Sequence, residues 1–503
     1  MSLDINNLPD DIALLKKLLA EQESVITQLQ QEKQQLLEQF RLAQQKQFGK
    51  SSEGFAGQGE LFNEAEALVE QADDEPEKES ISYERNKPKR KPLPTDLPRE
   101  TIVHDLTEEE KVCDCCEGKL HKIGEDKAEK LEFIPAQVKV IEHIRPKYAC
   151  RQCEKTGTSN PIKQAPVPAS PIPKGIATAS LLSQLITSKY QYGLPLHRQE
   201  AMFKQYGIEL SRKTMSDWII KSAKLFEPLV TRLKQELRQQ PVIHADETPV
   251  QVVKSDKAKS YMWLYCTGTD SPNPDSPIPN IVLYDYHDSR AAACVVNYLE
   301  GYSGYLQVDG YQAYEQTKTT LVGCWAHARR KFIEAKKVQA KNKTGKADMA
   351  LSYIQKLYGI ESKHKDKTVE EKYQARQQLA KPVLDKLHAW LTKQNVLPKT
   401  KLGEAIIYLN NQWPKLVRYL EDGRLSIDNN RAERAIKPFV IGRKNWLFSQ
   451  TDNGANASAA LYSIIETAKA NGIIPFDYVM KCLGELCQPE PNIESLLPWN
   501  LKL

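Results

Sequence analysis

The stretch "VIHADETPV", residues 242 to 250, decides the fold of this chain. Its first half is mostly apolar, and Asp246 and Glu247 then stand directly before Thr248 and Pro249. The pattern predicts a buried strand that starts at Val242 and ends at Asp246. An aspartate at a strand end often only starts a turn. It also suits metal binding, because a strand holds the carboxylate rigidly.

Further segments extend this strand into a sheet. The sequence predicts strands at residues 260–266, 280–286, 305–309 and 320–324, with a helix at 289–299. This order indicates an α/β domain with a mixed sheet. The run "YLQVD" again ends in an aspartate, Asp309, followed by Gly310. Because strand ends in open α/β sheets gather at one edge, we expect Asp246 and Asp309 to reach the same ion.

A third acidic candidate is Glu433, in "SIDNNRAERAIKPF" (residues 426–439). We expect Asn430 to cap a helix there, with Glu433 beside its apolar stripe. Glu433 could be a third metal ligand, or it could return to the cap amide in a capping box. The residues alone favour the capping box. The stripe consists of Ala432, Ala435, Ile436 and Phe439.

Composition limits the class of protein. The 503 residues are too many for one core, and 27% charged with 40% hydrophobic residues fits a globular protein of several domains. A net charge of +5 does not by itself indicate nucleic acid. Neither a signal peptide nor a membrane span is recognisable, which predicts a cytoplasmic protein with no membrane partner. Ten sparse cysteines favour metal binding over disulfides.

Residues 1–50 are predicted to form a coiled-coil helix that self-associates. The alternative is a single amphipathic helix docked on its own protein. Residues 51–100 read as a flexible linker whose basic run, 87–92, could contact DNA phosphates or act as a solvated spacer. The two seam positions of the heptad are Ile12, Leu19, Ile26, Lys33 and Phe40, and Leu15, Gln22, Leu29, Leu36 and Ala43.

Residues 101–165 contain the most specific spacing in the chain, two Cys-x2-Cys pairs. Four thiolates suit one tetrahedral Zn²⁺, so we predict a structural zinc-binding domain. The alternative is four reduced thiols. Cys115 could replace either cysteine of the first pair, which leaves the ligand assignment open there. The predicted zinc ligands are Cys113, Cys116, Cys150 and Cys153.

Residues 166–235 are predicted to be helical, with a helix-turn-helix outline. The first helix covers 196–203, a turn covers 206–210, and Ser211 caps a second helix that reaches residue 220. Many helical hairpins of this shape never contact nucleic acid. Where such a motif does bind DNA, the start of the second helix makes the contact. The candidates there are Arg212, Lys213 and Ser216.

The chain resembles the transposases of insertion sequence 66 type, in the DDE group with a ribonuclease-H-like catalytic domain. The resemblance rests on "HADETPVQV", "LQVDGYQAY", "GCWAHARRKF", "NNRAERAIKPFVIGRKNWLFS", "QFGKSSE", "LYSIIETAKANG" and the paired cysteines. It implies that Asp246, Asp309 and Glu433 bind catalytic Mg²⁺ or Mn²⁺. It further implies double-stranded DNA as substrate, both terminal inverted repeats and target, and partner proteins encoded by the same element. Lys437 and Cys115 depart from the family's usual residues.

The resulting organisation divides the catalytic core. Residues 236–335 and 425–450 form it, a helical insertion occupies 336–424, and a helical C-terminal region covers 451–503. The basic insertion could cover a DNA end or present an ordinary surface. Six cations near the site are candidates for binding DNA phosphates, with a solvated helix face as the alternative. They are Arg329, Arg330, Lys331, Arg434, Arg443 and Lys444.

His327 follows Cys324 at a spacing typical of metal ligands. No second pair stands nearby in the sequence, so we do not expect zinc there, and His327 is assigned to the edge of the site. The sequence therefore predicts a DNA transposase that cleaves and joins strands with two metal ions. Two alternatives remain open: a dimeric DNA-binding regulator with an inactive nuclease-like domain, and a structure-specific nuclease.

Overall fold

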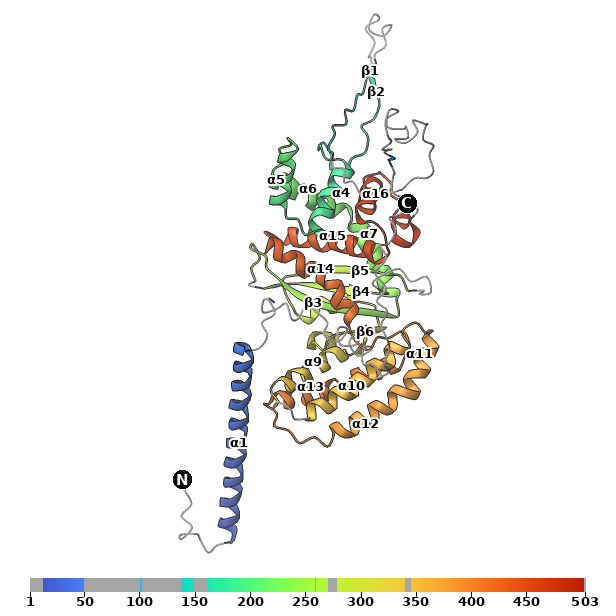
Figure 1. Cartoon of the computed structure of the whole chain (residues 1–503). Helices are drawn as coiled ribbons and strands as arrows, with labels where there is room; N and C mark the ends of the chain where they lie inside the picture. Colours follow the sequence, from blue (N-terminus) through green and yellow to red (C-terminus); the bar gives the residue numbers. More distant parts are fainter. Residues whose placement is uncertain are drawn as a thin grey trace, which may run out of the picture. The chain divides into compact units, whose positions relative to one another are not determined.

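The computed structural model describes residues 12–48, 100–101, 137–148, 162–257, 259–269, 278–339 and 345–501. The chain forms two compact units, Met1–Asp74 with Pro166–Leu503, and Glu75–Ala165 (Figure 1). In the second unit, β1 (Lys147–Tyr148) pairs antiparallel with β2 (Lys163–Gln164). The predicted zinc ligands Cys113, Cys116, Cys150 and Cys153, and the basic run 87–92, lie outside the described residues.

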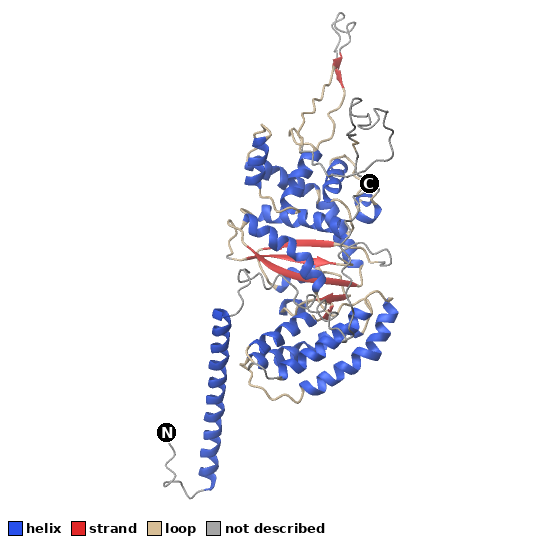
Figure 2. Ribbon diagram, in the orientation of Figure 1, coloured by secondary structure: helices blue, strands red, loops and turns tan. Residues whose placement is uncertain are grey.

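A five-stranded mixed sheet forms the centre of the first unit (Figure 2). Its strands are β3 (Val242–Val250), β4 (Ser260–Cys266), β5 (Val282–His287), β6 (Tyr305–Gln307) and β7 (Thr320–Val322). They lie in the order β5-β4-β3-β6-β7. The first three are antiparallel neighbours, whereas β6 and β7 run parallel to β3. The predicted α/β fold with a mixed sheet is thereby confirmed.

Helices cover the sheet, and one of them protects its edge. After α8 (Ala292–Tyr298) and the short η2 (Gln312–Gln316), the chain returns much later as α14 (Asn430–Trp446), which crosses the sheet (Figure 1). The next helix, α15 (Asp452–Ala470), lies along β5. There the amides of Val282 and Tyr284 donate to the hydroxyls of Thr467 and Ser463, at 3.0 and 2.8 Å. These bonds satisfy edge groups that would otherwise be open to another strand.

The helices before the sheet match the predicted helix-turn-helix outline. They are α4 (Ala179–Tyr190), α5 (Leu196–Gln205), α6 (Arg212–Leu225) and α7 (Glu227–Gln239). Ser211 caps α6, because its Oγ accepts a bond from the amide of Thr214 at 3.1 Å. The helix runs five residues past the predicted end at 220, since Ser222 and Ala223 continue its buried face. After α15 the chain closes with α16 (Pro475–Leu486), η5 (Glu494–Leu496) and η6 (Pro498–Asn500).

Between β7 and α14 the chain builds a separate helical body. Its helices are α9 (Trp325–Lys337), α10 (Lys346–Lys363), α11 (Val369–Ala375), η3 (Arg376–Ala380, a π-helical turn), α12 (Lys381–Leu391), α13 (Lys401–Leu416) and η4 (Val417–Leu420). They share their own apolar core, which includes Phe332, Ile354, Leu387 and Leu409. This body joins two distant parts of the sheet region, because β7 precedes it and α14 follows it.

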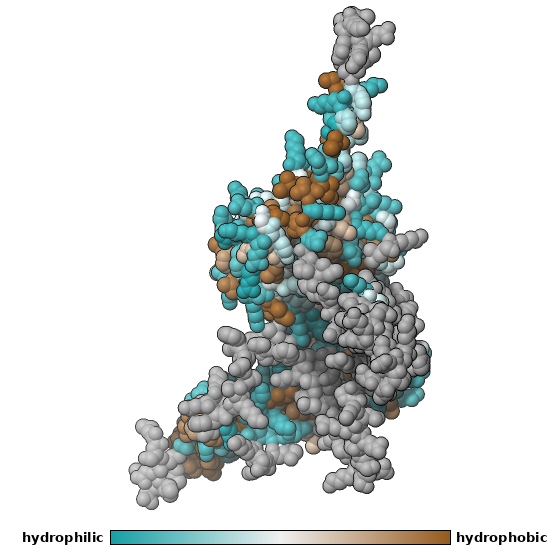
Figure 3. Space-filling model, turned by 45° about the horizontal axis from the view of Figure 1, so that its top comes forward, coloured by the Kyte–Doolittle hydropathy of each residue, from teal (hydrophilic) through white to brown (hydrophobic). Residues whose placement is uncertain are grey.

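The first helix, α1 (Ile12–Phe48), is continuous over 37 residues, or about 55 Å at 1.5 Å per residue. Its seam side chains are mostly exposed: Leu29 is 58% and Leu36 65% exposed. Apolar and polar side chains stand beside one another along this helix (lower left in Figure 3). Near its end, Glu38 Oε2 accepts a bond from the amide of Lys401 at 3.1 Å. No helix among the described residues is long and apolar enough to cross a membrane.

Candidate active site at the junction of β3, β6 and α14

Asp246 lies inside β3 and not at its end, which corrects the sequence prediction. β3 continues to Val250, because Glu247–Val250 pair with the beginning of β4. Pro249 does not break this strand: on the other side, β3 pairs with β6 only through His244, so the missing amide costs no ladder bond. Asp246 stands two residues beyond that pairing, where β3 leaves β6 behind.

Asp309 occupies the turn that follows β6. One of its carboxylate oxygens, Oδ1, accepts a bond from the amide of Tyr311 at 2.9 Å. Gly310 takes a φ of +102°, which a side chain would strain. The hydroxyl of Tyr408, on α13, donates to the carbonyl of Asp309 at 2.9 Å. Asp309 therefore starts a turn, and the helical insertion also braces it.

Glu433 stands in the first turn of α14, and it does not form a capping box. The helix begins at Asn430, one residue earlier than a cap at Asn430 would require, and Asn429 is its N-cap. The amide of Asn429 donates to Cys324 Sγ at 3.2 Å, and that of Asn430 donates to Asp428 Oδ1 at 3.1 Å. Glu433 is thus released from the capping role that the local sequence favoured.

Asn429 anchors α14 to the strand that carries Asp246. Its Nδ2 donates to the carbonyl of Ala245 at 2.8 Å, and its Oδ1 lies 3.1 Å from His244 Nδ1. Both contacts are buried, and they span about 185 positions of sequence. Asn429 was not among the residues predicted from the sequence, and the Asn-Asn pair at the start of the helix is the signal that could have identified it.

Burial and neighbouring carboxylates raise the pKa of Asp246 and that of Glu433. The pKa of Asp246 is raised well above its usual value by burial, and then by the charges of Glu247, Asp309 and Glu433. The pKa of Glu433 is also raised, chiefly by burial, although nearby Arg330 opposes the shift. Within the described residues, a trio of ligand atoms all within 4.8 Å of one another occurs at Cys324, His327 and Glu433, and not at the acidic triad.

Glu247 points away from Asp246, since successive strand residues face opposite sides of a sheet. Its side chain is only 2% exposed. Arg290 Nε donates to it at 3.0 Å, and the hydroxyl of Tyr314 donates to its other oxygen at 2.6 Å. The Arg290 guanidinium also lies 3.7 Å from the ring centroid of Tyr311, beside the Asp309 turn. The sequence did not predict this network. It lies on the face of β3 opposite Asp246, and it reaches the Asp309 turn through Tyr311.

The structure divides the predicted DNA-binding cations by their surroundings. Arg330 Nη2 lies 3.9 Å from Glu433 Oε1, at the centre itself. Arg443 Nη1 donates to Thr248 Oγ1 at 3.0 Å and also to the carbonyl of Pro249. Its guanidinium therefore holds α14 against β3, a structural contact that the sequence did not reveal. Lys444 is exposed, whereas Arg329, Lys331 and Arg434 are half-buried.

The three predicted DNA-binding residues of the helix-turn-helix differ in their contacts and in their exposure. Arg212 Nε forms an ion pair with Glu200 Oε2 on α5 at 2.9 Å, so part of its charge is neutralised within the motif. Lys213 is exposed, and Ser216 is half-buried.

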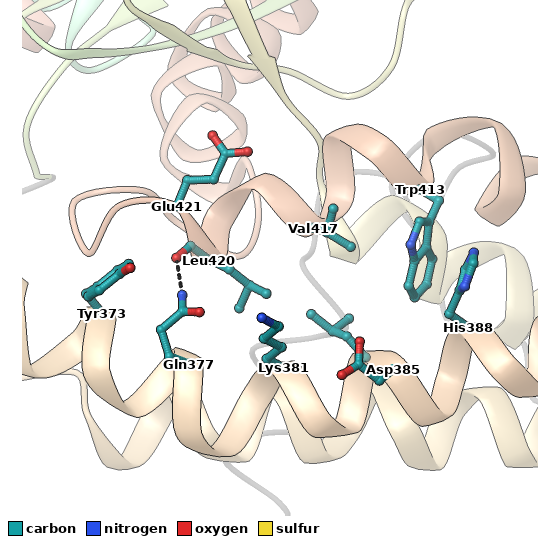
Figure 4. Close-up of a pocket in the computed structure, with 10 residues that line it drawn as sticks. Tyr373, Gln377, Lys381, Asp385, His388, Trp413, Val417, Leu420 and Glu421 are labelled. Atoms are coloured by element: carbon teal, nitrogen blue, oxygen red, sulfur yellow. Dashed lines mark hydrogen bonds between the residues drawn. The ribbon is translucent and has the colours of Figure 1, made fainter.

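A groove of about 450 Å³ lies elsewhere, in the helical insertion (Figure 4). Gln377 on η3 donates to the carbonyl of Leu420 at 2.8 Å across it, and His388 leans against Trp413 with ring centroids 4.8 Å apart. No residue of the acidic triad lines this groove. It is therefore separate from the candidate active site.

Comparison with protein families places this chain in the class of insertion-sequence transposases. The model described as "Transposase IS66 family" matches residues 174–457, and the chain belongs to this family. Three further models of the same system match: a zinc-finger binding domain of transposase IS66 at 110–154, "Transposase C of IS166 homeodomain" at 35–102, and the IS66 C-terminal element at 463–499. The resemblance stated from sequence is confirmed.

The chain is also similar to proteins of Sinorhizobium fredii that are described as uncharacterized. It is 34% identical to y4jD, over 82% of this chain and 81% of that protein. It is 33% identical to y4hP, over 84% and 78% of the two chains, and 34% identical to y4qI, over 83% and 79%.

The raised pKa of Asp246 predicts how the stability of the metal-free protein depends on pH. Because the folded-state pKa of Asp246 is raised, folding disfavours its charged form, and stability falls as pH rises from the unfolded pKa through the folded one. We expect Asp246→Asn to raise the free energy of unfolding at neutral pH by about 0.5–2 kcal/mol. Below about pH 4 the difference should vanish, because both states are then protonated.

Thermal unfolding in chelator between pH 4 and 8 measures this effect. The exposed Asp256→Asn variant is the matched control and should follow the wild type. A neutral-pH midpoint for Asp246→Asn below that of the wild type would contradict the prediction.

Proposed function

We propose that this protein is a transposase that binds the ends of an insertion sequence, cuts DNA strands there and joins them to target DNA. In this proposal Asp246, Asp309 and Glu433 bind the catalytic metal ions. The observation that carries the proposal is that β3, the turn after β6 and the first turn of α14 bring together three acidic residues that are distant in sequence. They lie close enough that the charge of Asp309 contributes to the raised pKa of both Asp246 and Glu433. Membership of the IS66 family supports the same activity.

The order of the sheet supports a ribonuclease-H-like domain. Numbered along the chain within the sheet, the strands lie in the order 3-2-1-4-5, with an antiparallel meander followed by two parallel strands. The helix α14 packs on β3 and β4. This topology gives the first strand a central position, and Asp246 stands on that strand.

The residues at the junction fit a hard divalent cation. Glu433 Oε1 is buried without a hydrogen-bond partner among the protein atoms, and Asp246 is surrounded by like charges. Carboxylate oxygens are the ligands that Mg²⁺ and Mn²⁺ prefer. When bound, such ions would activate a water or a 3′-hydroxyl and stabilise the leaving oxygen of the phosphodiester.

The chain itself positions these groups. The pairing of β3 with β4 fixes Asp246, which stands opposite Leu264, and the turn bond from the Tyr311 amide fixes one oxygen of Asp309. Asn429 sets the start of α14, and so the position of Glu433. Arg330 lies beside Glu433, and we assign it to contact with a scissile phosphate when DNA is bound. Preorganisation of this kind removes the need to order the groups during the reaction.

The other parts of the chain are assigned to DNA binding and assembly. We infer a structural zinc ion at Cys113, Cys116, Cys150 and Cys153, which all fall within the matched zinc-finger region. Lys213 and Arg212 on α6, with Arg329, Lys331, Arg434 and Lys444 near the site, contact the phosphate backbone. The protein acts in the cytoplasm, where the DNA is, with accessory proteins of the same element.

Purified protein, Mg²⁺ and labelled element ends test the whole proposal. Joined products support a transposase. Cut ends alone would support the structure-specific nuclease, and binding without cleavage would support the regulator.

Self-association through α1 is part of the proposal. The exposed seam of α1 covers little of its own protein, although Glu38 and Arg41 contact the helical insertion. Leu29→Glu with Leu36→Glu should weaken the oligomer at least about 100-fold, because burying unpaired carboxylates costs several kcal/mol. Light scattering coupled to size exclusion measures the mass.

The matched control is Ser24→Glu, which adds a charge on the opposite side of the same helix. It should keep the wild-type mass. An unchanged mass for the double seam variant would show that α1 does not carry self-association.

A further inference from the structure

We propose that Cys324, His327 and Glu433 form a second metal site, selective for a Zn²⁺-class ion and adjacent to the catalytic centre. The inference rests on the proposed function in one respect only, the role of Glu433 as a ligand shared by both sites. The ligand set itself comes from the structure.

The three side chains converge from two helix starts. Cys324 is the N-cap of α9, and His327 lies in the first turn of that helix. Glu433 lies in the first turn of α14, 106 positions further along the chain. One sulfur, one imidazole nitrogen and one carboxylate oxygen all lie within 4.8 Å of one another. The packing of α14 therefore supplies the third ligand that the Cys-x2-His spacing lacked.

Two of these groups lack a hydrogen-bond partner within the protein, although Arg330 Nη2 lies 3.9 Å from the carboxylate of Glu433. His327 Nδ1 and Glu433 Oε1 are both buried without a hydrogen bond to protein. They face each other at 3.7 Å, which is too long for a hydrogen bond. Buried polar atoms are almost always satisfied, and leaving one unsatisfied costs about 1–3 kcal/mol. A cation bound between them would satisfy both.

The surroundings suit a thiolate ligand. The amide of Asn429 donates to Cys324 Sγ at 3.2 Å, an outer contact of the kind that orients metal-bound sulfur. In the metal-free protein, burial and the charges of Asp428 and Glu433 raise the pKa of Cys324, and the bond from the Asn429 amide acts against this shift. A bound cation would favour the thiolate. Asn429 in addition binds β3, so the sulfur, α14 and the catalytic strand are mechanically connected.

The chemistry of the donors separates this site from the acidic triad. Thiolate and imidazole favour Zn²⁺, whereas Mg²⁺ and Mn²⁺ favour oxygen ligands. Because Glu433 belongs to both sets, an ion held by Cys324 and His327 withdraws this carboxylate from Asp246 and Asp309. Zn²⁺ would thus inhibit the Mg²⁺-dependent reaction.

Metal content of the full-length protein tests the site without any activity. Wild type and Cys324→Ala are loaded with Zn²⁺ or Co²⁺ and dialysed, and the bound metal is counted. We expect Cys324→Ala to hold about one equivalent less than wild type and to lose part of the thiolate-to-Co²⁺ absorption. The buried Cys482→Ala is the matched control and should keep both. Equal metal content in wild type and Cys324→Ala would overturn the inference.

His327→Gln guards against a folding defect at the buried cysteine, because His327 is partly exposed. It should lose the same equivalent, and Glu433→Gln should bind Zn²⁺ at least about tenfold more weakly. In DNA cleavage, with each protein normalised to its own Mg²⁺ activity, His327→Gln should need at least about tenfold more Zn²⁺ for half-inhibition. Equal zinc sensitivity would refute the shared ligand. A protein with the extra equivalent but no cleavage would refute the proposed function instead.

Discussion

Asp309→Asn is expected to abolish DNA strand cleavage and joining while leaving binding to element ends intact. The substitution removes a negative charge and a metal-binding oxygen from the candidate centre. A loss of about 4 kcal/mol in transition-state stabilisation lowers the rate about 10³-fold. The fold should survive, since the asparagine Oδ1 can still accept the bond from the Tyr311 amide that forms the turn. Labelled ends with Mg²⁺ measure cleavage, and gel shift measures binding.

The matched control is Asp385→Asn, an exposed aspartate in the insertion, which should keep wild-type cleavage. A regulator with an inactive domain would lose nothing in either variant. Full cleavage by Asp309→Asn would therefore remove Asp309 from the centre and end the three-carboxylate proposal.

Arg376→Met is expected to destabilise the helical insertion by about 3–5 kcal/mol. The side chain of Arg376 is only 3% exposed. Its guanidinium donates at 2.8 Å to the carbonyls of Tyr419, Asp422 and Leu425, and it forms a two-point contact with Glu361 at 2.9 and 2.6 Å. Methionine fills the volume but leaves Glu361 and these carbonyls unpaired, which is costly in a buried setting.

Denaturant unfolding followed by tryptophan fluorescence measures the loss. Arg424→Met is the control: its ion pair with Asp422 is more exposed, and surface pairs contribute about 1 kcal/mol or less. Equal free energies of unfolding for the two variants would show that the buried contacts of Arg376 do not stabilise the helical insertion more than a surface ion pair does. Because Leu425 leads into α14, Arg376→Met should also slow cleavage through the position of Glu433.

Local patterns predicted the regular elements well. The run 260–266 was predicted as a strand with the observed limits of β4, because Tyr261, Trp263 and Tyr265 recur at every second position, which is the period of a strand. Ser211 was predicted as a cap, since a serine before a helical pattern has one strongly favoured role. These features depend on neighbours within a few residues, which the sequence displays directly.

Long-range packing explains the errors. Pro249 and the preceding carboxylates suggested a strand end at Asp246. However, β3 continues to Val250 because this part pairs with β4. Its other side has no strand partner beyond His244, so a proline is tolerated there. Glu433 matched a capping box, but Cys324 and Asp428 take the two amides at the helix start. In both cases the outcome depends on which group becomes the partner. That group is either distant in sequence or one of several local acceptors, and a local sequence pattern does not show which one forms the contact.

The sequence by itself determined the family, the order of the elements and three acidic candidates, because motifs and periodicity are written in neighbouring residues. Only the tertiary structure decided which groups meet. The Arg290 and Tyr314 bonds to Glu247 depend on where the segment before α8 and the short helix η2 lie against β3. The contacts of Asn429 with β3 and the approach of Glu433 to Cys324 and His327 depend on the packing of α14. That packing follows from burial of apolar surface along the whole helix, and a short stretch of sequence does not specify which distant side chains it brings together.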